Sequence, residues 1–536
     1  MEDSVFPAFG LDTDWFHRAA TDGGAVARVY INMLAPETFR TVIGVAVPQH
    51  EEPALLAGEV LARPLEFLCR SHVFGILNSM AHSIQNFDAL ACPEPVEGAE
   101  NDLRRDALEI AEAGYEAINV GSAIERKMHI ENGELHIAEV RPPQNETAYQ
   151  LAGRRVFFVG IGKCALTAAS AIEKLFGDTL TGGIAFDVSD ESLRTPGVHS
   201  SCGRLASSSK IEVFIGTHPL PSEVNERATE RIIEFLSDCR EDDLVIFLIS
   251  GGGSTLLCSP EAPMTPDDES TLFKELTAHG ATIQDINTVR KHISHARGGG
   301  LTRAAYPAEI VSLIVSDVPG NDIAFISSGP TVKDATTIAD AKAILEKYDI
   351  TSSTNTVFVE TPKEEKYFER VSNILFLTSK DALDAMSDEA TQRGYKTEIV
   401  DDHFSGEARE VGRAVVEKLH EASPKTALLY AGESTVTISS SSGIGGRNQE
   451  MALAVLETVR DDEIILPFAS DGHDNTDHAG AIGDAVTIAH AQEKKLSIAE
   501  YLDEHRSYEF FSTTGDALDT GYTGSNISDL IIALKK

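Results

Sequence analysis

IVSLIVSDVPGNDIAFISSGPT, residues 310–331, is the stretch that decides the fold. An apolar, β-branched run long enough for a buried strand stops at Ser316 and Asp317, and a Pro-Gly loop follows. Such an aspartate lies at the carboxyl end of a strand, which is the edge where ligands bind in an open α/β sheet. Asp317 is therefore a candidate to hold a magnesium ion or to accept a proton from an attacking hydroxyl. The alternative is an aspartate that only caps its own turn.

The composition is typical of a soluble globular protein with more than one domain. Its 536 residues exceed what one core usually supports, so we expect two domains with appendages. The formal net charge of −39 would repel nucleic acid and anionic membranes, which argues against both as partners. Long apolar runs are missing, and acidic Glu2 and Asp3 stand where a signal peptide needs basic residues, so we expect a cytoplasmic protein. The 6 cysteines form no CxxC pair, which favours reduced thiols over disulfides or a zinc site.

The first hundred or so residues carry no pattern that indicates chemistry. Helical patterning is local, at residues 55–67 and 73–84, and the Pro-, Glu- and Gly-rich residues 91–101 are typical of a linker. A helix over 103–117 and a hairpin over 128–140, with Asn132-Gly133 as its turn, are expected next.

The first clear α/β unit contains Gly160-Ile161-Gly162-Lys163 between a strand and a helix. Backbone amides and Lys163 then lie at a helix amino terminus, where an anion is favoured. Two other interpretations stay open. Gly160, Gly162 and Ala165 satisfy a loose dinucleotide-binding fingerprint, with Asp187 about 20 residues further on, and a simple tight turn would use the same glycines.

Two further stretches indicate anion sites. Ser250-Gly251-Gly252-Gly253-Ser254 follows a buried strand and can turn its N–H groups inward as a nest for phosphate or carboxylate, with a flexible turn as the alternative. Arg290, Lys291 and Arg297 form a basic cluster beside glycines in a very acidic chain, with a solvated helix face as the alternative.

A second lobe of alternating strands and helices is expected after residue 362, beginning with a strand over 374–377. Within it, Gly445 and Gly446 open a helix that starts at Arg447. An arginine in a first helical turn opposes the helix dipole, so Arg447 predicts a bound anion.

Asp471, Asp474 and Asp477 are spaced three residues apart in a loop after a strand. Their carboxylates could bind a hard cation through oxygen ligands. The alternative is an Asx-rich turn that satisfies its own amides.

With these loops in view, the chain resembles the class II glycerate 2-kinases, whose carboxyl-terminal module is the MOFRL domain. The matching stretches, in order, are GIGK (160–163), THPLPSEVNERA (217–228), SGGGSTLL (250–257), NTVRKHIS (287–294), SDVPGNDIAFISSGPT (316–331), GESTVTI (432–438), GGRNQEMALA (445–454) and TGSNISDL (523–530). The resemblance implies a two-domain α/β fold. Its parts would be an N-terminal extension over 1–102, a Rossmann-like domain over 103–362 and a smaller α/β domain of the MOFRL type over 363–536.

The resemblance also implies ATP-dependent phosphorylation of D-glycerate at its 2-hydroxyl, with Mg²⁺ bound. Lys163, Asp317 and Arg447 match the active-site Lys, Asp and Arg of the family. Asp471 and Asp474 are the metal ligands expected, although the acidic loop DGHDNTDHAGA is shorter than the common family pattern. Two other departures are Arg297 in place of a lysine and Ser525 in place of a threonine.

Phosphoryl transfer needs mainly positioning and positive charge around an anionic transition state. Lys163 and Arg447 are expected to neutralise the transferring phosphoryl group, and Asp317 to orient or deprotonate the hydroxyl. The other contacts expected with phosphate or substrate are Gly160, Gly162, Ser250, Gly251, Gly252, Gly253, Ser254, Arg290, Lys291, Arg297, Glu433, Gly445, Gly446 and Asn448. The partners would be small molecules, and the protein a monomer or homodimer. Two rival functions are an NAD(P)H-dependent hydroxypyruvate reductase and a non-catalytic glycerate-binding protein.

Overall fold

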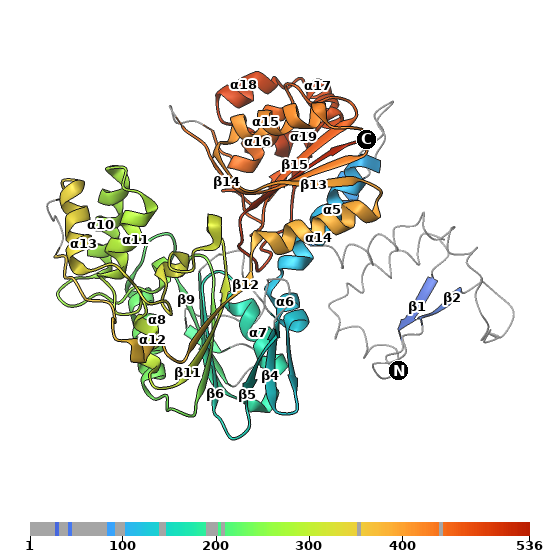
Figure 1. Ribbon diagram of the computed structural model, residues 1–536. Helices are drawn as coiled ribbons and strands as arrows, with labels where there is room; N and C mark the ends of the chain where they lie inside the picture. Colours follow the sequence, from blue (N-terminus) through green and yellow to red (C-terminus); the bar gives the residue numbers. More distant parts are fainter. Residues whose placement is uncertain are drawn as a thin grey trace. The chain divides into compact units, whose positions relative to one another are not determined.

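The computed structural model describes residues 27–31, 41–45, 83–91, 102–138, 146–188, 202–204, 210–350, 355–438 and 443–536 (Figure 1). The chain divides into a unit over residues 1–71 and a unit over residues 72–536. In the first, β1 (Ala27–Ile31) pairs antiparallel with β2 (Thr41–Val45). The expected helix over 55–67, most of that over 73–84, and residues 92–101 of the expected linker lie outside the described residues.

The larger unit includes residues that we expected to belong to the N-terminal extension. The backbone amides of Ser83 and Ile84 donate to the carboxylate of Glu112, at 2.8 and 2.6 Å. Asn86 donates to the carbonyl of Ala517 at 2.9 Å, just before the short helix α4 (Phe87–Ala91). The expected limit of the extension at residue 102 is therefore too late.

The first large sheet has the strand order β12-β11-β10-β6-β7-β9-β8. All of its neighbouring strands run parallel except β8, which is antiparallel to β9. Taken in chain order, the six parallel strands are arranged 3-2-1-4-5-6, which is the Rossmann order with its switch point between β6 and β10. The strands are β6 (Val156–Ile161), β7 (Leu180–Val188), β8 (Cys202–Arg204), β9 (Ile211–Gly216), β10 (Leu244–Ile249), β11 (Glu309–Val315) and β12 (Val371–Leu377).

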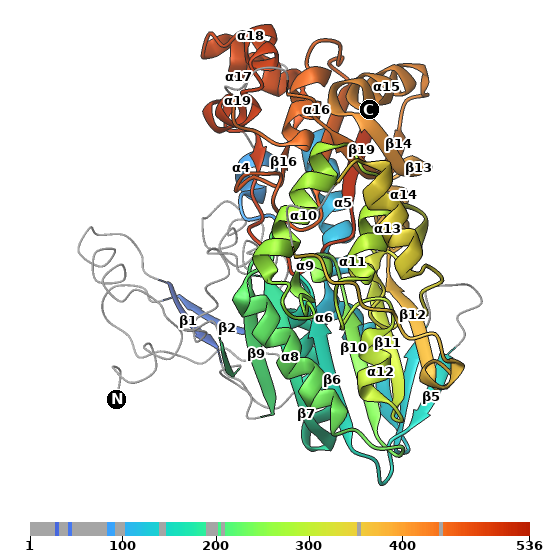
Figure 2. The same ribbon diagram turned by 90° about the vertical axis from the view of Figure 1, so that its left-hand side faces the viewer.

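Helices cover both faces of this sheet, because successive strand residues send apolar side chains to opposite sides. One face packs against α7 (Ala165–Phe176), and the other against α8 (Glu223–Ser237), which lies in front of the strands in Figure 2. The remaining helices of this half are α9 (Gly253–Leu256), α10 (Pro266–Ala278), α11 (Ile283–Lys291), α12 (Gly300–Ala305) and α13 (Ile338–Lys347).

The second large sheet has the order β13-β14-β19-β15-β16-β18, with β17 beside β15. The final strand β19 lies in its middle and runs antiparallel to both neighbours. The strands are β13 (Lys396–Glu407), β14 (Thr426–Thr435), β15 (Glu463–Ala469), β16 (Gly480–Ala481), β17 (Gly483–Asp484), β18 (Ala517–Leu518) and β19 (Asp529–Lys535).

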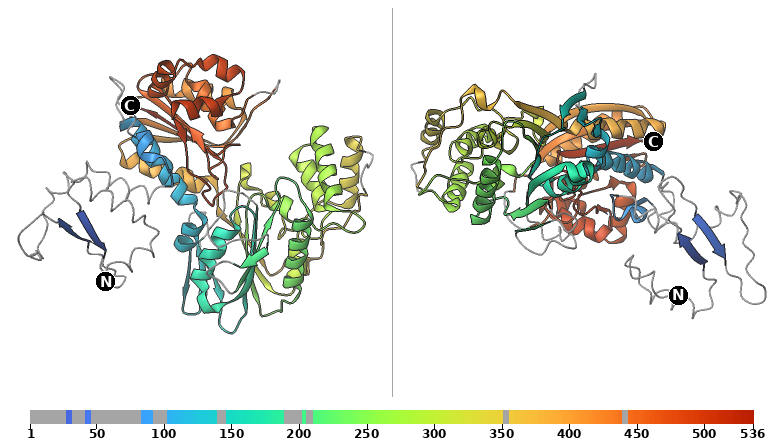
Figure 3. Two further views of the ribbon diagram at one scale, coloured as in Figure 1. Left: turned by 180° about the vertical axis from the view of Figure 1, so that it is seen from behind. Right: turned by 90° about the horizontal axis from the view of Figure 1, so that it is seen from below.

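One face of the second sheet is covered by α5 (Asp102–Ile118) and α14 (Ser379–Gln392), which lie side by side in Figure 1. The other helices lie on the opposite side, as the view from behind in Figure 3 shows. They are α15 (Ala408–Glu421), α16 (Arg447–Val455), α17 (Ala485–Glu493), α18 (Ile498–Asp503) and α19 (Ser507–Thr514). The α/β fold expected from the sequence, with a Rossmann-like parallel sheet followed by a second α/β part, is confirmed.

The structure corrects one expected element. The strand over 374–377, expected to open the second lobe, is part of β12 and pairs with β11 at the edge of the first sheet. Conversely, α5, expected in the first domain, packs on the second sheet. An amphipathic or buried pattern shows that an element faces a core, but not which of two cores. The two sheets therefore do not divide at the expected boundary of residues 362 and 363.

A small third sheet lies between α5 and β6 in the sequence. The helix α6 (Val120–Lys127) leads into β3 (Met128–Glu131), β4 (Glu134–Ala138) and β5 (Glu146–Gln150), which form an antiparallel sheet with β4 in the middle. The expected hairpin is confirmed, with both turn residues at positive φ, 53° for Asn132 and 81° for Gly133. Strand β5 was not expected.

None of the described helices is long and apolar enough to cross a membrane. The cysteines whose side chains are described, Cys164, Cys239 and Cys258, are buried free thiols.

Candidate active site

The topology of the first sheet brings two glycine loops together. Strands β6 and β10 are neighbours at the switch point, with Ile161 opposite Ile249, so the loops that follow them meet. The amide of Lys163 donates to the carbonyl of Gly251 at 3.0 Å. A side chain at Gly162, where φ is +108°, would come within 2.4 Å of the Ser250 hydroxyl, so this approach requires glycine.

Asp317 lies at the same edge, because β11 is the next strand beyond β10. A Cβ on Gly251 would lie 2.1 Å from a carboxylate oxygen of Asp317, so the loop passes directly over this side chain. The same oxygen accepts a hydrogen bond of 2.9 Å from the side-chain amide of Asn526, on the segment that leads into β19. Burial raises the pKa of Asp317 to about 6, opposed by Lys163 and by the Asn526 hydrogen bond and supported by Glu433. A carboxylate with this pKa changes its ionisation close to neutral pH.

Lys163 pairs with an aspartate from the second half of the chain. Its ammonium group lies 2.9 Å from Oδ2 of Asp471, which follows β15. The other carboxylate oxygen of Asp471 accepts the amide of His473 at 3.0 Å. Burial alone would lower the pKa of Lys163, but Asp471 and then Asp317 outweigh it and raise that pKa. Lys163 therefore stays cationic beside Asp317.

The loop over residues 250–254 offers amide donors to this place. Gly252 adopts the left-handed conformation at φ +86°, directly before α9. The serine side chains around it already have partners, with Ser254 2.9 Å from Ser328, and Ser327 donating to the carbonyl of Ser250 at 2.7 Å. In contrast, the amides of residues 251–254 donate to no other residue in the described part of the chain. This fits the nest expected for an anion.

Arg447 is held by carboxylates of the protein itself. Its Nε and Nη2 donate to the two carboxylate oxygens of Asp529, at 2.5 and 3.1 Å, and its Nη1 donates to Glu433. The argument that only a bound anion can justify an arginine in this helical turn was therefore wrong. Three of its five N–H donors are used in these bonds, which leaves two for a ligand. Glu433 connects this cation to the site, because its charge acts on Asp317 and on Arg447.

Asp474 is not available as a metal ligand. Its Oδ1 accepts from the amide and the side chain of Asn448, and its Oδ2 accepts from the amide and the side chain of Gln449. A side chain on Gly446 would meet Asp474 at about 2 Å, so the glycine makes room for it. The anion at the start of α16 is thus the protein's own Asp474, which corrects both the metal and the phosphate contacts expected there. Gly445 likewise packs on Ser507.

The basic cluster after α10 is mostly structural. Arg297 is fully buried and pairs with Glu269 at 2.5 Å, and buried Lys291 lies 3.3 Å from Asp334. Both side chains are buried against these carboxylates, so their contacts give no support to the anion site expected from them. Arg290 is different, since its guanidinium stacks 4.2 Å over the ring of Phe273. Burial lowers its pKa to about 10, and its charge acts on His218.

The acid of the dinucleotide fingerprint is internal. Asp187 is buried, and its carboxylate accepts the amides of Leu166 at 2.9 Å and Val188 at 2.7 Å. Burial raises its pKa to about 8. A carboxylate occupied in this way does not present itself to a ribose, which removes the main support for the dinucleotide interpretation.

Three residues of the site were not expected from the sequence. Asn526 and Asp529 stand in the TGSNISDL stretch. The sequence feature that could have indicated them is the presence of polar residues just before an apolar strand. His218 lies in THPLPSEVNERA near Lys163, and burial, then Lys163 and Arg290, lower its pKa to about 4. It is therefore neutral and able to accept or donate one hydrogen bond at each ring nitrogen.

The donor set suits a magnesium ion brought by a nucleotide. Asp317 and Asp471 supply carboxylate oxygens, which hard cations prefer, and each lies next to Lys163. Among the described residues, no group of three ligand atoms close enough to cage a metal lies at this site. Magnesium usually binds through one or two carboxylates together with phosphates and waters, so such a cage is not required.

Comparison with known proteins supports a single family. The chain matches the family described as "Domain of unknown function (DUF4147)" over residues 106–360 and the "MOFRL family" over residues 426–529. It is 35% identical to the glycerate 2-kinase of Pyrococcus horikoshii, over 72% of this chain and 88% of that protein. It is 36% identical to an Agrobacterium vitis protein that carries the provisional name hydroxypyruvate reductase, over 70% of this chain and 86% of that protein.

Solved structures agree. The crystal structure of a glycerate kinase from Thermotoga maritima matches 82% of this chain and 100% of its own, with 31% identity and a TM-score of 0.69. A Pyrococcus horikoshii protein matches 81% of this chain and 98% of its own, with a TM-score of 0.66.

Proposed function

Because this chain belongs to the glycerate 2-kinase family with a C-terminal MOFRL domain, we propose that it transfers the γ-phosphoryl group of ATP to the 2-hydroxyl of D-glycerate, giving 2-phosphoglycerate and ADP. The observation that carries the proposal is the surroundings of Asp317. A partly buried carboxylate with a pKa of about 6 lies beside a lysine and under a loop of unused amide donors. General-base catalysis works best when the pKa of the base is close to the working pH.

Asp317 acts as the general base. It accepts the proton of the 2-hydroxyl as the oxygen attacks the γ-phosphorus, and Asn526 holds the carboxylate in place through the 2.9 Å hydrogen bond. At pH 7 to 8 a group with this pKa is mostly ionised, so the free base is the resting form. The hydrogen bond from Asn526 also restrains the Asp317 side chain, and a fixed base can be held in reach of the attacking hydroxyl.

Lys163 and Arg447 compensate the charge of the transferring phosphoryl group. Lys163 uses one of its three donors on Asp471, and Arg447 has two N–H groups beyond those bound to Asp529 and Glu433. The amides of residues 251–254 add neutral donors for phosphate or glycerate oxygens. Preorganised donors of this kind stabilise developing charge without reorganisation during the reaction.

Asp471 is the residue that would hold Mg²⁺, which leaves Asp317 to act on the substrate hydroxyl. The ion would supply positive charge for the β- and γ-phosphate groups of ATP. ATP and glycerate are both small anions, which a chain with a net charge of −39 would repel. The few cations of the site would offset this repulsion locally.

The test is an activity assay with product identification. Purified protein is incubated with ATP, Mg²⁺ and D-glycerate, ADP is measured, and ³¹P NMR distinguishes 2-phosphoglycerate from 3-phosphoglycerate. We expect ADP and 2-phosphoglycerate in equal amounts. Formation of the 3-phosphate would overturn the regiochemistry, and no ADP at all would overturn the kinase proposal.

A parallel reaction with hydroxypyruvate and NADH or NADPH addresses the reductase named for the Agrobacterium vitis relative. We expect no loss of reduced cofactor absorbance. If glycerate binds by calorimetry but neither reaction proceeds, the chain is a binding protein instead.

A further inference from the structure

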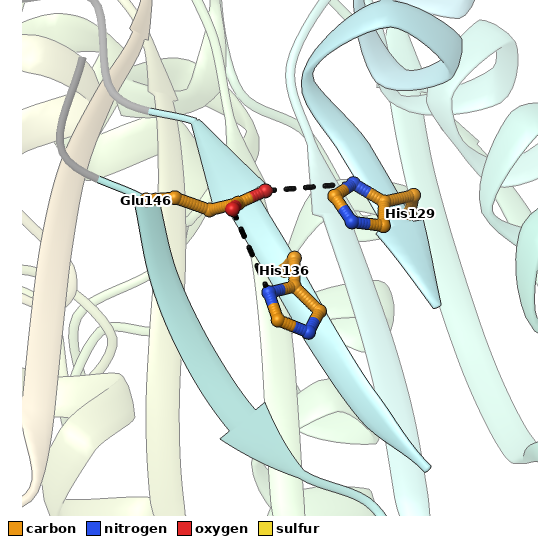
Figure 4. Close-up of side chains that lie close together, drawn as sticks. All are labelled: His129, His136 and Glu146. Carbon is orange, nitrogen blue, oxygen red and sulfur yellow. Dashed lines mark ion pairs between the residues drawn. The ribbon is translucent and has the colours of Figure 1, made fainter. Parts of the chain in front are cut away.

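A second cluster of ligand-type side chains lies on the small sheet β3-β4-β5, outside the proposed active site (Figure 4). Each strand supplies one residue. His129 of β3 stands directly opposite His136 of β4, so both side chains point to the same face. Glu146 opens β5 opposite Ala138, which is two residues from His136 and therefore on that face as well.

The three side chains converge on one point. Nδ1 of His129 lies 3.5 Å from Oε1 of Glu146, and Nδ1 of His136 lies 3.7 Å from Oε2. One ligand atom from each residue lies within 4.8 Å of the others. A zinc ion bound tetrahedrally at 2.0–2.1 Å from nitrogen and oxygen holds its ligand atoms about 3.4 Å apart. The two imidazole rings are stacked, with centroids 4.8 Å apart and an angle of 6° between the ring planes, so both exposed rings must turn about their side-chain bonds to direct a nitrogen at one ion.

A fourth residue completes the pattern of a metal-binding histidine. The other ring nitrogen of His136, Nε2, lies 3.8 Å from a carboxylate oxygen of Glu134. The carboxylate of Glu134 is itself bonded by the side chain of Gln150. Histidines that bind a metal through one nitrogen commonly have a carboxylate near the other, which orients the ring and makes it a stronger ligand.

We propose that His129, His136 and Glu146 form a binding site for a divalent transition-metal ion such as Zn²⁺. Two imidazoles and one carboxylate select Zn²⁺, Ni²⁺ or Cu²⁺ over Mg²⁺ and Ca²⁺, which prefer sets made only of oxygen ligands. The ligands are accessible, with exposed fractions of 54% for His129, 19% for His136 and 46% for Glu146, so water fills the remaining positions and the ion exchanges with solvent.

The bound ion would tie all three strands together. Among the described strands, β5 pairs with β4 alone and β3 with β4 alone, so no ladder hydrogen bonds between described residues link the outer strands. A metal held by His129 and Glu146 adds that link. The opposite face of this sheet is buried, and Met128, Leu135 and Ile137 belong to the same core cluster as Cys164 and Ala165, at the start of α7.

The competing use of these side chains is a simple ion pair between Glu146 and protonated histidines. Calorimetric titration with ZnCl₂, in the presence of excess Mg²⁺, separates the two. We expect the full-length protein to bind one Zn²⁺ more than His129→Gln/His136→Gln, and Glu146→Gln to weaken that binding at least tenfold. The matched control is His403→Gln, in the Asp401-Asp402-His403 group, which also brings three metal-ligand side chains close together.

A second readout identifies the ligands. Cu²⁺ bound at this site should give an electron paramagnetic resonance spectrum with hyperfine splitting from two nitrogens, which the double histidine variant loses and His403→Gln keeps. Equal Zn²⁺ stoichiometry and affinity in the wild type and the double variant would overturn the proposal. So would a site lost in His403→Gln instead. Because these residues lie outside the proposed active site, the turnover of glycerate in each variant reports that the protein is folded.

Discussion

Replacing Asn526 by alanine tests whether Asp317 is the general base. Asn526 donates a 2.9 Å hydrogen bond to Asp317 and lowers its pKa against the larger effect of burial. A hydrogen bond to a charged group contributes about 1.5 to 3 kcal/mol, and one pKa unit corresponds to about 1.4 kcal/mol, so its loss should raise this pKa by roughly one unit or more. The base must be ionised to act, so the acidic limb of kcat/KM should move from near pH 6 to near pH 7 or above.

The expected loss of activity therefore depends on pH. For a rise of one unit, the ionised fraction of Asp317 at pH 6 falls from about one half to about one tenth, whereas at pH 8 it stays at roughly nine tenths. The assay is kcat/KM for D-glycerate between pH 5 and 9, with ATP and Mg²⁺ saturating. Ser525→Ala is the matched control, because Ser525 donates to the carbonyl of Ile118 at 3.0 Å and does not contact Asp317. An unchanged acidic limb in Asn526→Ala, with a uniform fall in rate, would refute the assignment of Asp317 as the base.

Three other substitutions test the remaining assignments. Lys163→Met removes the cation beside Asp317 and should lower kcat by roughly 10²- to 10³-fold without loss of the folded state, as measured by steady-state kinetics and circular dichroism; a rate close to that of the wild type would contradict its role. Arg297→Met breaks the buried pair with Glu269 and should reduce the free energy of unfolding by about 3 to 5 kcal/mol in urea titrations, while kcat of the folded enzyme is preserved. Asp474→Ala should cost about 2 kcal/mol of stability or more but leave the Mg²⁺ concentration for half-maximal rate unchanged, whereas Asp471→Ala should raise that concentration.

The sequence was sufficient to predict the positions of the loops around Asp317. Strands β6, β10 and β11 are short apolar runs that end in glycine or in a polar residue, and each run predicts a buried parallel strand. Once the strand order places β10 between β6 and β11, Lys163, Gly251 and Asp317 must lie at one sheet edge. The local sequence pattern and the topology rules are therefore enough to bring these three residues together.

The partners of charged side chains could not be predicted in this way. Arg447 and Asp529 are 82 residues apart, and the two meet only because β19 inserts in the middle of the second sheet. Asp474 resembles a metal ligand in sequence, yet the start of α16 lies directly against it and takes both oxygens. A single sequence contains the charge and the spacing but not the tertiary pairing that decides whether a charge is free.

The same pairings bear on how a strongly acidic protein would bind the anions that we propose as its substrates. Both cations of the proposed site lie against carboxylates: Lys163 against Asp471, and Arg447 against Asp529 and Glu433. A ligand that competes with these carboxylates must carry more negative charge than the group it replaces, and a triphosphate does so whereas a lone carboxylate does not. We therefore expect the site to favour a multiply charged phosphate donor before any specific contact with the nucleotide base is made.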